Sequence, residues 1–232
     1  MNSKTFCKTI IFSFLILGGF SFWGCASLPK EVYVPLNPEV ERLAVYKKLP
    51  VQAALLISEG DKNYVYKVTP SVEQLSSIVH AFPLGDALEK DSVQIFSQIF
   101  MGVQVVRTPA ETQKFKIVIA PKIEEFSFRY EEGKGSYSDI RYIVPTAAIK
   151  VKTTLYREGI QIWEKSIKSP EQRKTTPYNP AFTSENEMGE VASQALNYAL
   201  KKIAEEIAQD PEVEKNVANI PLDGRKKTYA QR

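Results

Sequence analysis

The chain predicts an α+β fold, in which one domain contains an antiparallel sheet of about five to seven strands with two main helices on one face. Three observations predict it. Several runs alternate apolar and polar residues as strands do, and two longer stretches repeat apolar residues at helical spacing. The composition, 44% hydrophobic and 25% charged, is that of a globular protein. At 232 residues the chain is long enough to bury a core of its own.

Residues 1–24 have the pattern of a secretory signal peptide. Lys4 and Lys8 make the start of the chain positive, and residues 9–24 carry no charge. A membrane-spanning helix needs about 20 apolar residues, so this run is short for a permanent span and fits a signal peptide. Residues 25–49 are rich in proline, which fixes φ and removes a hydrogen-bond donor. We expect them to form an extended tether.

The predicted domain covers residues 50–209 and begins with strands. Residues 51–58 form a short apolar run, residues 59–61 favour a turn, and residues 64–68 are expected to be the hairpin partner of that run. Residues 71–83 fit either a helix or a strand ahead of Pro83. An apolar stripe along residues 84–101 predicts a helix that ends at Gly102, before a strand at residues 103–106.

The second half of the domain is predicted to hold the long strands and the longest helix. Residues 115–130 alternate around Pro121, which implies a bulge or an edge position. Residues 131–139 are expected to connect flexibly to a strand at 149–156, which a turn at 158–159 joins to a strand at 160–167. Residues 168–183 favour a long loop. Ser184 and Glu187 form a capping box for a helix that continues to Ile207, and residues 210–232 are expected to be a flexible polar tail.

The residue inventory excludes most common catalytic sets, and the charge balance predicts no polyanionic partner. The net charge of +3 includes Lys4 and Lys8, so the remainder is nearly neutral and we expect no nucleic-acid partner. His80 is the single histidine and only two cysteines occur, which predicts no metal site, no cofactor and no nucleophilic triad. Neighbouring carboxylates, as at 124–125 and 131–132, point to opposite faces of a strand. We therefore expect that the chain is not an enzyme.

Cys25 stands where the apolar run ends. Gly24 and Cys25 resemble the end of the lipobox of bacterial lipoprotein precursors, in which the cysteine is acylated and the chain is cut just before it; Phe22 and Trp23 depart from that pattern. The resemblance implies lipidation at Cys25, cleavage between Gly24 and Cys25, and a lipid anchor in the membrane. Two alternatives stay open: ordinary cleavage that leaves a soluble protein starting at Ser27, and an uncleaved anchor. By resemblance to the sorting of enterobacterial lipoproteins, Ala26 after the cysteine implies the outer membrane, with the domain facing the periplasm.

Four aromatic residues are candidates for an interaction surface, because exposed aromatic side chains are enriched at interfaces. They are Tyr130, Tyr137, Tyr142 and Trp163. The alternative, which we favour, is that these side chains merely cover the sheet.

The order of elements together with Cys25 resembles the auxiliary lipoproteins of ABC-type envelope transport and the related outer-membrane lipoproteins of envelope assembly. The resemblance covers residues 50–209 and implies a domain that acts by binding. We therefore expect a non-catalytic accessory or scaffold in the bacterial cell envelope, with envelope proteins such as an ABC-type transport system as partners. The alternative is a carrier of lipid or another small apolar ligand in a groove between sheet and helices.

Overall fold

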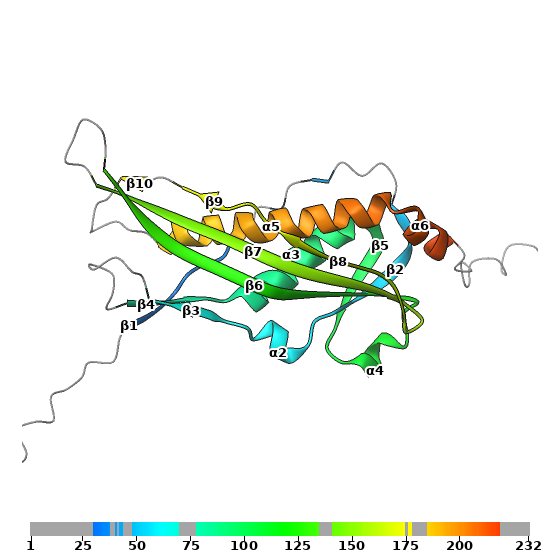
Figure 1. Ribbon diagram of the computed structural model, residues 1–232. Coiled ribbons are helices and arrows are strands. Elements are labelled where there is room, and N and C mark those ends of the chain that lie inside the picture. Colours follow the sequence, from blue (N-terminus) through cyan, green and yellow to red (C-terminus); the bar gives the residue numbers. More distant parts are fainter. Residues whose placement is uncertain are drawn as a thin grey trace, which may run out of the picture. The chain divides into compact units, whose positions relative to one another are not determined.

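The computed structural model describes residues 30–37, 40, 42–43, 48–69, 78–134, 141–174, 176–177 and 185–218. Residues from Glu31 onward form one compact unit, and Met1–Lys30 form another, of which only Lys30 is described. The α+β fold class is confirmed: two sheets and two main helices build the unit (Figure 1).

A seven-stranded sheet is the largest element of the fold, with the order β10-β7-β6-β2-β5 and with β8 and β9 also paired to β7 (Figure 1). Its longest strands, β6 and β7, pair antiparallel throughout and extend beyond the runs that alternation predicts. The strands are β2 (Leu49–Leu56), β5 (Phe100–Val106), β6 (Ile117–Lys134), β7 (Arg141–Arg157), β8 (Ile160–Lys168), β9 (Gln172–Arg173) and β10 (Thr176–Pro177). The last two lie within the segment predicted to be a long loop.

The sheet is mixed, so the expectation of a wholly antiparallel sheet is wrong for β2. This strand runs parallel to both of its neighbours, β5 and β6. Ala53, Ala54 and Leu55 are all completely buried, which means that both faces of β2 are covered. A continuous apolar run of this kind is typical of parallel strands.

The predicted hairpin of residues 51–58 with 64–68 is also wrong. A short helix, α2 (Glu59–Lys62), follows β2, and its N-cap residue Ser58 accepts a hydrogen bond from the backbone N–H of Asp61. The chain is thereby directed into a second sheet, where β3 (Tyr66–Val68) pairs with β4 (Ile78–Phe82). The extended alternative for the end of the 71–83 segment is therefore the right one.

The smaller sheet has the order β1-β4-β3 and takes up part of the predicted tether. β1 (Lys30–Tyr33) is its edge strand, and the Val34 N–H donates to the Ala81 carbonyl at 2.9 Å. Val34 is completely buried, and Leu49 already belongs to β2. The part of the tether around these residues is folded onto the domain.

Two helices pack on one face of the large sheet and against each other. They are α3 (Leu84–Ile99) and α5 (Glu185–Gln209), and both were predicted from their apolar stripes. The core lies between them and the inner faces of β2, β6 and β7. α3 ends two residues earlier than the expected range of 84–101, because Phe100 already begins β5 and Gly102 lies within that strand.

The tail expected from residue 210 begins instead with a helix, α6 (Pro211–Ala218). The Asp210 carboxylate accepts hydrogen bonds from the N–H groups of Glu212 and Val213 at 2.8 and 3.1 Å, and Pro211 occupies the first helical position. Val213 and Val217 are buried in the core, so the helix is anchored by one apolar side.

β6 contains a bulge, which is one of the two alternatives that Pro121 implied, but the bulge lies at Glu124 rather than at the proline. Pro121 lies inside the strand opposite Thr153, and the register shifts between Ile123 and Glu125. The extra residue keeps both Ile123 and Phe126 on the inner face although they are three positions apart, which strict alternation forbids. One strand can therefore cover the core along its whole length.

Within the described residues no helix is long and apolar enough to cross a membrane.

Candidate functional site

Tyr130 does not form an interaction surface, because it is buried at 6% exposure. Its hydroxyl donates to the sulfur of Met188 on α5, and its ring meets that of Phe128 edge to face at 4.9 Å. Burial raises the pKa of the hydroxyl well above its ordinary value. The side chain fastens the start of α5 to β6, which is a structural role.

Trp163 covers the sheet, which is the alternative that the sequence favoured. It stands opposite Leu155 in the β7–β8 pair and packs, half-buried, against the core. Tyr137, Gly24 and Cys25 lie outside the described residues. Tyr142 is described only by its backbone, which pairs with Pro177.

The outer face of β6, β7 and β8 is a ladder of ion pairs. Glu124 binds Lys150 at 3.0 Å, and Glu164 binds Lys152 at 2.9 Å. The hydrogen bond from Lys150 is the largest of the effects that lower the pKa of Glu124, so this carboxylate stays ionised and is a poor general acid. The adjacent Glu125 is 3.9 Å from the same lysine. These carboxylates stabilise the face of the sheet.

His80 lies in the core, at 2% exposure, at the junction of β4 with β6 and α5. Its ring centroid is 6.2 Å from that of Tyr130, and neither ring nitrogen has a hydrogen-bond partner. Burial lowers the pKa of the imidazole, and the charge of Glu185 opposes this only in part. No described hydroxyl, thiol or carboxylate is hydrogen-bonded to His80, which leaves it without the partners of a catalytic triad.

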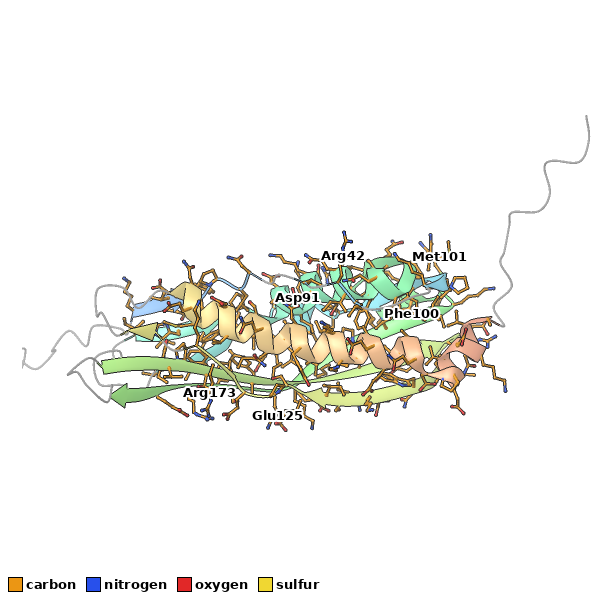
Figure 2. The ribbon with its side chains drawn as sticks, turned by 90° about the horizontal axis from the view of Figure 1, so that it is seen from above. Arg42, Asp91, Phe100, Met101, Glu125 and Arg173 are labelled. Carbon is orange, nitrogen blue, oxygen red and sulfur yellow. The ribbon has the colours of Figure 1, made fainter. Side chains whose placement is uncertain are left out.

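Asp91 is the unexpected group of the structure. It lies in α3 (Figure 2). The side chain is completely buried, and neither carboxylate oxygen has a hydrogen-bond partner. Burial raises its pKa to about 8, against an opposing effect of Lys90. The hydroxyls of Ser92, on the same helix, and Ser193, on α5, are also buried without partners. The sequence carried a sign of this group, since Asp91 interrupts the stripe of Leu88 and Ile95.

A cleft of about 320 Å³ lies beside α5, and residues of α3 and β9 also line it. Its lining mixes three apolar or aromatic side chains with amide groups and one lysine: Val40, Ile95, Gln172, Gln194, Asn197, Tyr198 and Lys201. Such a lining suits a polar ligand better than an acyl chain.

The described residues show neither a metal-binding group nor an activated titratable pair. In the part of the chain that the structure describes, no three His, Cys, Asp or Glu side chains are grouped so that they can hold a metal ion. The buried titratable groups His80 and Asp91 both lack the hydrogen-bonded partners that activate catalytic groups.

No protein-family model and no curated protein sequence matches the chain. Among solved structures, it is similar to protein XCC0632 of Xanthomonas campestris, of the DUF330 family, at 11% identity over 77% of this chain and 95% of that one, with a TM-score of 0.45. A putative neuraminyllactose-binding hemagglutinin homolog from Helicobacter pylori has 11% identity over 79% and 95% of the two chains and a TM-score of 0.39. A minor lipoprotein from Acinetobacter baumannii has 12% identity over 71% and 91% and a TM-score of 0.30. We draw no function from likenesses this distant.

Proposed function

We propose that the chain is a lipid-anchored protein of the bacterial envelope that serves as a non-catalytic accessory or scaffold in transport or assembly. The observation that carries the proposal is the position of Cys25, directly after an uncharged apolar run with a positive start. Acylation of this thiol would hold the domain at a membrane surface, with the outer membrane and its periplasmic side as the expected location.

The folded position of β1 supports a role close to that membrane. β1 begins at Lys30, so only residues 26–29 separate Cys25 from a strand of the domain. A fully extended chain spans at most about 3.5 Å per residue, which limits this separation to roughly 20 Å. A domain held this closely meets partners in or next to the same membrane.

Mass spectrometry of the mature N-terminus tests the anchor. We expect an acylated Cys25 as the first residue, and we expect Cys25→Ser to lose the acyl groups and to keep an uncleaved leader. A mature protein that begins at Ser27, or one that retains Met1, would contradict the anchor.

Crosslinking tests the accessory role separately. Crosslinking in intact cells followed by purification is expected to recover a repeatable set of envelope proteins, for which an ABC-type transport system is the first candidate. The set should shrink for Cys25→Ser, because the domain is then no longer held beside its partners. Acylated protein that recovers no partner would leave the anchor standing and contradict the accessory role.

A carrier of a small ligand is the second candidate, and the cleft beside α5 is the observation that favours it. Its amide-rich lining fits lipid poorly. Native mass spectrometry of protein purified from membranes tests this function. A bound small molecule that Gln194→Ala releases would support a carrier, and ligand-free protein would contradict it.

A further inference from the structure

β5 is an edge strand of the large sheet. It pairs with β2 along one side, and no other described strand pairs with it. Among the described strands, the backbone N–H and C=O groups on the side of β5 away from β2 therefore have no partner strand. Edge strands of this kind are templates for the addition of a further strand.

The helices cover the side chains of β5 only in part. Val103 and Val105 contact the core but are only partly buried, whereas their partners on β2, Ala53 and Leu55, are completely buried. The helix layer thus covers β2 fully and β5 incompletely. Met101, at the start of the strand, is 66% exposed (Figure 2).

The two edges of the sheet differ in how they are protected. β8, on the opposite edge, carries Glu164, Lys165 and Lys168, and such charges are a common means of preventing edge-to-edge pairing. β5 reads FMGVQVV and contains neither a charged residue nor a proline. The β8 edge therefore carries charges that oppose pairing, and the β5 strand carries none.

We propose that β5 is the surface on which a second copy of this chain docks, by antiparallel pairing of the two β5 strands around a two-fold axis. A strand without charge can pair with its own copy without placing like charges opposite each other. Such a pairing also brings the half-covered Val103 and Val105 of each copy against those of the other, and it continues the sheet across the interface.

The size of this interface places the dimer in the weak class. Seven residues at about 3.3 Å each give a contact roughly 23 Å long, which is expected to bury less than the about 1,200 Å² of a stable complex. A common membrane anchor raises the effective concentration of the two strands, and this step alone depends on the function proposed above. In solution we expect reversible, concentration-dependent association.

Sedimentation equilibrium of the full chain in density-matched detergent tests the proposal. We expect a monomer–dimer equilibrium whose dissociation constant rises at least tenfold in the double variant Met101→Lys, Gln104→Lys. The matched control makes the same change on the β8 edge, with Ile160→Lys and Gln161→Lys, where Ile160 is 71% exposed. The control should change the dissociation constant less than twofold.

A second measurement guards against misfolding and fixes the partner. Thermal unfolding of both double variants shows whether the fold is kept, and Gln104→Cys with a short thiol-reactive crosslinker in cells reports what lies beside β5. A crosslinked homodimer supports the proposal. It is overturned by a wild-type chain that stays monomeric at all concentrations, by a dimer that persists in the folded β5 variant, or by crosslinking of Gln104→Cys to a different protein.

Discussion

At the scale of the residue, Asp91 is held in an environment that suits its neutral form. A buried carboxyl without hydrogen bonds is costly to ionise, and its pKa of about 8 lies far above the ordinary value of 3.8. Between these two values the folded state keeps the proton and the unfolded state releases it. Stability from this group is therefore present at low pH and is lost as the pH rises toward 8.

Asp91→Asn tests this account, because the amide cannot ionise. From pH 6.5 to pH 8 we expect wild-type protein to lose about 2 kcal/mol of unfolding free energy and the variant to lose little. Urea unfolding at the two pH values measures the difference. Asp86→Asn, at an exposed position in the first turn of the same helix, is the control and should follow wild type. Equal losses in wild type and Asp91→Asn would show that the carboxyl is already paired or hydrated.

Gly189 is required by a close contact. A Cβ at this position would lie 1.8 Å from the carbonyl oxygen of Pro35, which belongs to the segment after β1. In an open helix, replacing glycine by alanine stabilises by up to about 1 kcal/mol. Here the steric clash reverses the sign.

We expect Gly189→Ala to lower the unfolding free energy by about 1–3 kcal/mol, as overpacking does. Gly60→Ala in α2 is the matched control, since the nearest atom to its added Cβ is Ser58 Oγ at 3.8 Å. The two urea midpoints should move apart. A midpoint for Gly189→Ala at or above that of wild type would show that residues 34–37 do not pack on α5 in solution.

At the scale of the element, the helices with a local pattern were predictable. α3 and α5 each carry one apolar stripe, and such a stripe depends on neighbours within the same segment. The pairing of β2 was not predictable from the sequence, because its partner strands are distant along the chain, at residues 100–106 and 117–134. Its continuous apolar run was compatible with a parallel strand, but the turn residues after it favoured a hairpin.

The sequence of α6 contains a helix pattern, but the polar composition of the segment from residue 210 led us to expect a flexible tail. Asp210-Pro211 is a strong helix start, and Val213 and Val217 share one side at a spacing of four. The candidate site was less predictable still. Tyr130 continues the alternation of Phe126 and Phe128, and Asp91 interrupts the apolar stripe of α3. Neither pattern shows that α5 and α3 pack over these side chains and bury them.

The turn between β7 and β8 stores strain that a substitution can remove. Glu158 has φ 51° and Gly159 has φ 82°, and two consecutive positive values are the mark of a type I′ hairpin turn. Glycine tolerates this region, whereas glutamate pays about 1 kcal/mol there. Asparagine is preferred at the first position of such turns.

We expect Glu158→Asn to raise the unfolding free energy by about 0.5–1 kcal/mol. The complementary change, Gly159→Ala, should lower it, although nothing lies within 4 Å of the added Cβ, because the backbone conformation alone is unfavourable. Thermal unfolding of both variants checks the signs. A lower melting temperature for Glu158→Asn would mean that the Glu158 side chain contributes more than its strain costs.

At the scale of the whole molecule, the buried and the exposed charges act on stability in different pH ranges. The exposed carboxylates of Glu124, Glu164 and Glu171 are held ionised by hydrogen bonds from basic neighbours, which lower their pKa values. Their contribution is present above the ordinary value of 4.5 and is lost in stronger acid. Since the pairs are exposed, salt screens them.

Below pH 6.5, the titrations of His80 and Asp91 change the unfolding free energy in opposite directions. Burial lowers the pKa of His80 below its ordinary value of 6.5, so the unfolded state takes up a proton first and stability falls as the pH falls through this range. Asp91 changes stability in the opposite direction over the same range, because its folded pKa is raised. Each group alone changes the unfolding free energy by about 1.4 kcal/mol per pH unit where it is protonated in only one of the folded and unfolded states. The net stability of wild type is therefore expected to depend less on pH just below pH 6.5 than the titration of either group alone would make it.

Removing the imidazole of His80 should leave only the effect of Asp91 on the pH dependence of the unfolding free energy. His80→Phe keeps a ring beside Tyr130 and cannot be protonated, so its unfolding free energy should keep rising as the pH falls from 6.5 to about 5, by roughly 1–2 kcal/mol relative to its value at pH 6.5. Urea unfolding across this range, at low and high salt, measures the effect. The difference between the two profiles should survive high salt, because both groups are buried and only the exposed pairs are screened. Parallel profiles for wild type and His80→Phe would mean that water or a counter-charge reaches one of the two buried groups.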